Sequence, residues 1–254
     1  MKIVINWVLF IIVIVTNALA NILPINGYNT GQISGFYPNY FVPAGFTFSI
    51  WGIIYLLLLN YSISFTYFTV RKTTFPEIKK YLDAITPYYW VTCILNASWI
   101  LTWHYLQAGL SVLIMLAFLY CLIKIFILMQ DLATGIKPLY LFLLKTPFSV
   151  YIGWISVATI ANITALLVSF KWNGFGIDPI YWTLVMISIA IVLSAYFIIQ
   201  YKNIAYPLVV IWALWGIKAS QGSKSALINQ LTVVGILVLG ALISRVVSKK
   251  IIAR

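Results

Sequence analysis

Residues 110–130 read LSVLIMLAFLYCLIKIFILMQ and carry a single charge, Lys124. A helix needs about 20 mostly apolar residues to cross a bilayer, so this stretch predicts a membrane-spanning helix. A strand of a membrane barrel would instead alternate polar and apolar residues over about 10 positions. Because the run is continuously apolar, the sequence favours helices over a barrel.

Seven further apolar runs surround this one and predict an all-α polytopic membrane protein with about eight transmembrane helices. The predicted spans cover residues 3–22, 46–70, 88–106, 110–130, 148–170, 179–201, 204–219 and 226–247. The seventh is the shortest and also fits a re-entrant segment. The first resembles a cleavable signal peptide, because Ala18 and Ala20 form an A-x-A pattern, and its cleavage stays an open question.

The composition of the whole chain agrees with this class. The 254 residues are 63% hydrophobic and 8% charged, and the mean hydropathy is +1.02. A soluble domain has about 25% charged residues, so the composition excludes a water-soluble globule. Cys93 and Cys121 lie inside apolar runs, and His104 is the only histidine. We therefore expect neither a disulfide framework nor a metal site.

The net charge of +12 comes from residues at the ends of the apolar runs. This placement is typical of membrane anchoring and argues against nucleic-acid binding. With eight spans, twelve basic residues fall on one side of the membrane, and the other side receives Lys171, Lys218 and Lys224. The positive-inside rule then predicts a multi-pass protein of the cell (inner) membrane with both termini in the cytoplasm.

Residues for acid–base chemistry are nearly absent from the predicted spans. Lys124 lies near the cytoplasmic end of its span and can snorkel to the lipid headgroups. Asp83 and Asp178 precede apolar runs, which predicts that both are helix N-terminal residues. No phosphate-binding loop, metalloprotease or nucleophile motif is present. We therefore predict no catalytic residues and no metal ligands, and the sequence does not favour an enzyme.

Aromatic and amide side chains are the remaining candidates for function. The chain has ten tryptophans, and interfacial belts do not explain Trp51, Trp99 and Trp154, which lie inside their spans. Each has an aromatic or amide companion three or four residues away, which places the tryptophan and its companion on one face of their own helix. The predicted ligand-binding residues are Trp51, Tyr55, Asn96, Trp99, Tyr151, Trp154, Ala158 and Asn162.

Indole and amide groups on one face suit a flat, mostly apolar ligand that carries a few polar groups. The alternative for Asn96 and Asn162 is a hydrogen bond to a neighbouring helix. Residues 23–43, LPINGYNTGQISGFYPNYFVP, are uncharged and rich in aromatic residues. They are too polar to span the membrane, and we expect either a lid over the bundle mouth or an ordinary ordered surface loop.

Three motifs in the chain resemble those of the translocator protein / tryptophan-rich sensory protein family. PAGFTFSIWGIIY at residues 43–55 resembles the entry to the second helix of that family. LNASW at residues 95–99 is similar to the L-N-x-x-W of the third helix, and YIGWISVATIAN at residues 151–162 to the Y-x-x-W-x-x-x-A-T-x-x-N of the fifth. The resemblance covers residues 1–172, and the whole chain looks like a long bacterial form with extra C-terminal helices.

The resemblance implies a five-helix membrane bundle over residues 1–172, with a lid at 23–43, and a three-helix membrane extension over residues 173–254. Members of the family bind porphyrins, sterol-like lipids and synthetic aromatic ligands inside the bundle. Carried over by motif, the pocket residues are Trp51, Asn96, Trp99, Tyr151, Trp154, Ala158 and Asn162. The implied partners are the lipid bilayer, a small hydrophobic ligand and a second copy of the chain in a homodimer.

The resulting hypothesis is a membrane sensor or regulator that binds a planar hydrophobic ligand such as a porphyrin or haem, with no resident cofactor. Phe170 stands where the family's sterol-contact pattern has a tyrosine, which argues against a sterol. A transporter of a neutral or lipophilic solute is the main alternative, since eight spans suffice for alternating access. A membrane enzyme that acts on porphyrin through light-driven tryptophan chemistry is a third.

Overall fold

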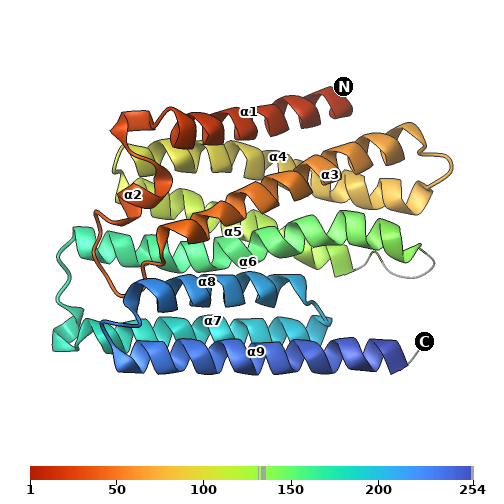
Figure 1. The fold of residues 1–254 in the computed structure, drawn as a ribbon. Coiled ribbons are helices and arrows are strands. Elements are labelled where there is room, and N and C mark those ends of the chain that lie inside the picture. Colours follow the sequence, from red (N-terminus) through yellow and green to blue (C-terminus); the bar gives the residue numbers. More distant parts are fainter. Residues whose placement is uncertain (131, 133–135, 253–254) are drawn as a thin grey trace.

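The computed structural model describes residues 1–130, 132 and 136–252, and these residues form a bundle of helices (Figure 1). The helices are α1 (Lys2–Ile22), α2 (Thr30–Ser34), α3 (Ile50–Val70), α4 (Pro76–His104), α5 (Ala108–Gln130), α6 (Pro138–Ser169), α7 (Pro179–Tyr201), α8 (Ala205–Gln221) and α9 (Ala226–Ile252). Three short 3-10 turns are η1 (Ile25–Gly27), η2 (Gly45–Ser49) and η3 (Gly174–Gly176). The predicted all-α class is confirmed.

Eight of these helices are long, and each overlaps one of the eight predicted spans. Six of them, α1, α3, α5, α6, α7 and α9, are long and apolar enough to cross a membrane, so the chain is a polytopic membrane protein. The other two are less apolar or shorter. Helix α4 carries Glu77, Lys79, Lys80 and Asp83 near its start, and α8 has 17 residues. The count of eight crossings therefore stays a prediction.

Two helices begin well before the predicted spans. Helix α4 starts at Pro76 rather than at residue 88, and α6 starts at Pro138 rather than at residue 148. Proline favours the first helical position because its φ is already helical and its missing N–H would have no partner there. The length of an apolar run reflects the thickness of the bilayer core, and these two helices continue beyond it.

Of the two aspartates predicted as helix N-terminal residues, the structure confirms one and contradicts the other. Asp178 caps α7, since its carboxylate accepts a hydrogen bond of 2.8 Å from the backbone N–H of Ile180. The prediction for Asp83 is wrong: it lies two turns inside α4 and pairs with Lys79 and, at 2.6 Å, with Lys2 of α1. Burial raises the pKa of Asp83, but hydrogen bonds and charge from Lys2 and Lys79 outweigh it and lower the pKa. Asp83 thus joins α1 to α4.

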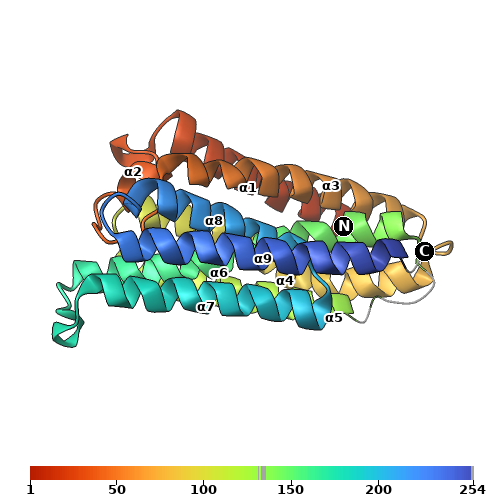
Figure 2. The ribbon, with the colours of Figure 1, turned by 60° about the horizontal axis from the view of Figure 1, so that its bottom comes forward.

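The start of α1 and the end of α9 lie at the same end of the bundle, and residues 23–49 and η3 lie at the other (Figure 1). Helix α6 occupies the centre and packs against α3, α5 and α8. Helices α7, α8 and α9 pack against one another, and Figure 2 shows α7 and α9 extending over the length of the bundle. The expected division at residues 172 and 173 falls in the turn between α6 and α7, and the division itself stays a prediction.

Helix α8 approaches α6 closely at Gly153. A Cβ atom on Gly153 would lie 3.1 Å from the carbonyl oxygen of Tyr206 and 3.2 Å from Cβ of Val209. Small residues allow helix backbones to approach in lipid, where association depends on packing rather than on the hydrophobic effect. Gly153 therefore determines how closely the α7–α9 helices lie against the rest of the bundle.

We predict that Gly153→Ala lowers the free energy of unfolding by about 1–3 kcal/mol, because the new methyl group overpacks the contact between α6 and α8. Thermal unfolding of the purified protein in detergent measures the change. Gly240→Ala in α9 is the matched control, since a Cβ there meets nothing within 4 Å. Equal stability of the two variants would contradict the importance of this contact.

Candidate ligand-binding site

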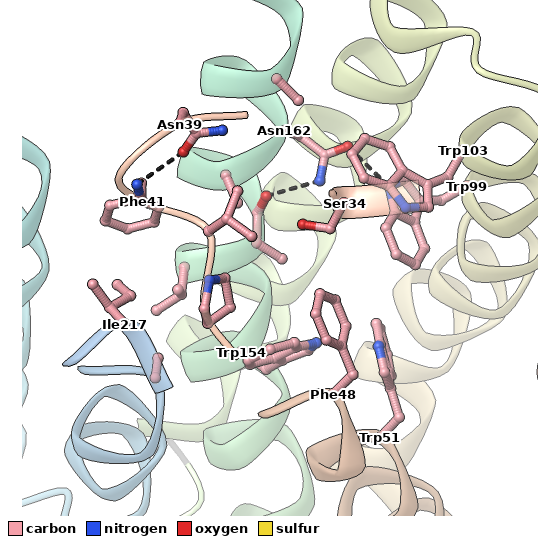
Figure 3. A pocket seen from close by; sticks show the side chains of 17 residues that line it. Ser34, Asn39, Phe41, Phe48, Trp51, Trp99, Trp103, Trp154, Asn162 and Ile217 are labelled. Atoms are coloured by element: carbon pink, nitrogen blue, oxygen red, sulfur yellow. Dashed lines mark hydrogen bonds between the residues drawn. The ribbon is translucent and has the colours of Figure 1, made fainter. Parts of the chain in front are cut away.

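Three tryptophans from three helices meet inside the bundle, at the end covered by residues 23–49 (Figure 3). Trp51 of α3 lies 5.8 Å from Trp99 of α4 and 6.2 Å from Trp154 of α6, measured between ring centroids. These distances are typical of favourable aromatic pairs, and all three side chains are buried. Residues chosen from three separate sequence motifs thus form one cluster.

A cavity of ≈ 40 Å³ lies beside this cluster and receives residues from five parts of the chain. Of the predicted site residues, it is lined by Trp51, Trp99, Trp154, Ala158 and Asn162. Its other lining residues are Ser34, Asn39, Phe41, Val42, Pro43, Phe48, Trp103, Val157, Ala161, Ala165, Ala213 and Ile217. None of these side chains is ionisable, so stacking, apolar contact and neutral hydrogen bonds are the interactions that the site offers a ligand.

The cavity is too small for a ring-containing ligand in this conformation. Small-molecule sites usually have volumes of about 300–1,000 Å³. A wider groove of ≈ 800 Å³ runs between α1 and α3, and both Phe48 and Trp51 line it as well as the cavity. These two aromatic side chains therefore separate the closed cavity from an open groove. Tyr55, which stacks on Trp51 at 5.6 Å, lines the groove and not the cavity.

The Oδ1 atom of Asn162 joins α6 to two other helices. Its Oδ1 accepts hydrogen bonds from Nε1 of Trp99 in α4, at 3.1 Å, and from the hydroxyl of Ser111 in α5, at 2.6 Å. Its amide nitrogen donates to the carbonyl of Ala158 at 2.9 Å. The interhelical role that the sequence left open for Asn162 therefore applies, and its backbone-facing amide contributes only surface to the cavity.

Asn96, which lies on α4 one turn before Trp99, also joins helices. Its Oδ1 accepts from the amide of Asn17 in α1, at 2.9 Å, and its Nδ2 donates to the hydroxyl of Tyr151 in α6, at 2.8 Å. Asn96 and Tyr151 are buried beside the aromatic cluster, but neither lines the cavity. The structure thus brings both residues next to the site and uses their polar groups to join α1, α4 and α6.

Trp154 differs from Trp99 in having a free donor. Its side chain is 3% exposed, and its indole Nε1 has no hydrogen-bond partner among the residues that the structure describes. A buried N–H without a partner costs about 1–3 kcal/mol. The same indole lies against the cavity and edge-on to Phe48, at 6.0 Å between ring centroids. A ligand with an acceptor group at this position would satisfy the donor.

Residues 23–43 fold against the end of α4. The ring of His104 contacts the carbonyl of Ile25 through Nδ1, at 3.1 Å, and the hydroxyl of Thr30 through Nε2, at 3.2 Å. Because a carbonyl only accepts, Nδ1 carries the proton in the neutral ring and Nε2 accepts from Thr30. Trp103 also donates to the carbonyl of Thr30, at 3.3 Å. His104 therefore anchors this segment. Separately, the described parts of the chain contain no group of three or more His, Cys, Asp or Glu side chains that could hold a metal ion.

Helix α8 holds the next part of the segment with three hydrogen bonds, which we call the α8 clasp. Gln221 donates to the carbonyl of Val42, Trp212 donates to the carbonyl of Thr47, and the N–H of Ala44 donates to the carbonyl of Gly216, each at 2.9 Å. The clasp fixes residues 42–47, which connect the cavity-lining part of the lid to α3.

The contact between α8 and the lid is also close in a steric sense. A Cβ on Gly216 would lie 2.0 Å from the hydroxyl oxygen of Thr47, so only glycine fits there. Ala213 and Ile217 of the same helix line the cavity. Neither Trp103 nor any residue of α8 was among the predicted ligand-binding residues. The four-residue spacing from Trp99 could have identified Trp103, whereas no local pattern marks α8.

A comparison of the chain with protein-family models gave a match. The model of the family described as TSPO-like protein matches residues 3–245 and so extends past residue 172 into α9. Searches of curated protein sequences and of solved structures returned no significant match. The family match spans nearly the whole chain, including the tryptophan cluster, the lid and the clasp. The chain therefore belongs to the TSPO-like protein family.

Proposed function

We propose that the protein binds a planar hydrophobic ligand, a porphyrin or a related tetrapyrrole, in the cavity bounded by α3, α4, α6 and residues 34–48, and that it acts as a sensor or regulator. The unpartnered indole N–H of Trp154 beside the cavity carries this proposal. The flat face of a tetrapyrrole would stack on Trp51 or Trp99, and a peripheral carboxylate or carbonyl would accept from Trp154. The membership of the TSPO-like family supports the same ligand class.

Binding at this site requires the lid to move, because the cavity holds only ≈ 40 Å³. The helical wall is the rigid side, since the amides of Asn96 and Asn162 join α4 to α6 by hydrogen bonds. The lid side contains Phe48, whose ring occupies the position edge-on to Trp154. Displacing residues 41–48 would open the cavity and expose the donor of Trp154 to the ligand.

The proposal includes the orientation in the membrane. Eight crossings place both termini on the cytoplasmic side of the cell membrane, where the positive-inside rule puts the twelve basic residues. The lid of the five-helix bundle and the start of the three-helix extension then lie at the opposite face of the membrane. The ligand would enter from that face or from the adjoining lipid leaflet.

Binding is favoured over transport by the continuity of the helices. Pairs of broken helices at mid-membrane would favour a transporter. Helices α4 and α6 instead continue through Pro87 and Pro147 without interruption. Uptake of protoporphyrin into liposomes that contain the protein separates the two functions, and ligand flux would replace the binding proposal with the transporter.

We predict that protoporphyrin IX quenches the tryptophan fluorescence of the purified protein in a saturable manner, and that Trp154→Phe weakens its binding about tenfold, since a hydrogen bond to a charged acceptor is worth about 1.5–3 kcal/mol. Trp7→Phe is the control, because Trp7 donates to Thr66 on α3 and does not line the cavity. Unsaturable quenching, or equal affinity of Trp154→Phe and the wild type, would count against the proposal.

The stability of the same variants gives an independent check. Trp154→Phe and Trp99→Phe lose the same part of a buried ring, but Trp154→Phe removes only a donor that has no partner in the described structure, so we expect it to be the more stable of the two. Trp99→Phe removes the hydrogen bond to Asn162 and should lower stability by about 0.5–1.5 kcal/mol. Thermal unfolding in detergent without ligand compares the two. A large loss in Trp154→Phe would assign that residue to the packing of the bundle instead.

A further prediction concerns the α8 clasp. Gln221→Ala removes one of its three bonds, worth about 1 kcal/mol, and should speed ligand association about fivefold if the lid opens before binding. Stopped-flow fluorescence with protoporphyrin IX measures the rate. The control is Gln200→Ala, an exposed glutamine of α7. Association rates that are the same in both variants would show that the ligand enters without release of the clasp.

A further inference from the structure

A second cleft lies between the C-terminal ends of α7 and α9, at the end of the bundle opposite the lid. Its volume is ≈ 500 Å³, within the range of small-molecule sites. It is lined by Ile198, Ile199, Lys202, Leu242, Arg245, Val246 and Lys249. It contains three cationic groups, whereas the cavity near the lid contains none.

The apolar and cationic residues of the cleft follow helical spacing on both helices. Leu242, Arg245, Val246 and Lys249 follow the i, i+3, i+4, i+7 spacing that defines one face of α9. On α7, Ile198 precedes Lys202 by one turn. The last lining residue on each side of the cleft is basic, Lys202 after Ile198 and Lys249 after Val246, while Arg245 lies between Leu242 and Val246. A basic end beyond apolar side chains matches the polarity of a lipid leaflet from its acyl region to its headgroups.

The three cations lack anionic partners in the described part of the chain. Both salt bridges found there involve Asp83 on α4. Asp178 begins α7 and so lies at the far end of that helix. Lys202 donates one hydrogen bond to the carbonyl of Ile199, which leaves its other donors for a ligand. The cleft thus combines an apolar wall with three positive charges that form no salt bridge with a described residue.

We propose that this cleft binds an anionic phospholipid. Lys202, Arg245 and Lys249 hold the phosphate group, and an acyl chain lies against Ile198, Leu242 and Val246. Basic pockets between transmembrane helices on the cytoplasmic side are suited to such headgroups. A free phosphate would use the cations and leave the apolar wall exposed, so the mixed lining favours the lipid. This site is separate from the proposed tetrapyrrole site and does not depend on it.

Native mass spectrometry of the full chain, purified in a neutral detergent, tests the proposal with phosphatidylglycerol and phosphatidylcholine as probes. The test variant is Lys202→Gln/Arg245→Gln/Lys249→Gln. The control is Lys171→Gln/Lys218→Gln/Lys224→Gln, which removes the same charge at the other end of the bundle. We expect the wild type and the control to retain phosphatidylglycerol preferentially, and each cation lost from the cleft to weaken retention about fivefold.

Two further arms identify the source of the phosphate group. Leu242→Asn leaves the charge unchanged and should reduce retention of phosphatidylglycerol, whereas a site for a free anion would be indifferent to it. Inorganic phosphate at millimolar concentration should fail to displace the lipid. Equal retention by the triple variant and the wild type, or displacement by inorganic phosphate, would overturn the proposal. If the triple variant does not fold, Lys249→Gln alone decides by the same comparison.

Discussion

Two asparagine amides between α4 and α6 are the interactions on which the candidate site depends. Helices in lipid gain little from the hydrophobic effect against one another, so close packing and polar bonds determine their positions. Asn96 of α4 bonds Tyr151 of α6, and Asn162 of α6 bonds Trp99 of α4. In both bonds the donor lies on α4 and the acceptor on α6, and each amide also bonds a further helix, through Asn17 in α1 or Ser111 in α5. This makes one wall of the cavity rigid.

The opposite wall is held by weaker means. Residues 42–47 are held to α8 by the three hydrogen bonds of the clasp, each worth about 1 kcal/mol net, or about 3 kcal/mol together. An opening that breaks all three would be populated at roughly 1% and would reduce the apparent affinity for a ligand about a hundredfold. In the proposed function, α8 would therefore affect ligand binding, although α7 and α9 do not line the cavity.

The sequence predicted the helices well and the site in part. Apolar runs located all eight long helices, but they missed the early starts of α4 and α6, because apolar length measures the membrane core and not the helix. Helical spacing placed Trp51, Trp99 and Trp154 each on a face with companions of its own helix, and the structure brings the three indoles together. Their part in ligand binding stays a prediction. The same spacing could not separate a cavity-lining face from one that bonds a neighbouring helix, so Asn96, Tyr151 and Tyr55 were included although they do not line the cavity. The clasp joins residues as distant as Val42 and Gln221, and no local pattern reports such a contact.

The distribution of charge separates the two proposed sites by their chemistry. The cavity is lined by neutral residues, so a change of pH would act on tetrapyrrole binding through the ligand's own carboxylates and the solvent rather than through the lining. The cleft between α7 and α9 relies on lysine and arginine, and salt would screen its attraction for a phosphate group. Helix α8 packs against both α7 and α9 and also holds the lid. A lipid that tightens α7 against α9 would therefore act on the lid through α8, which contacts both regions.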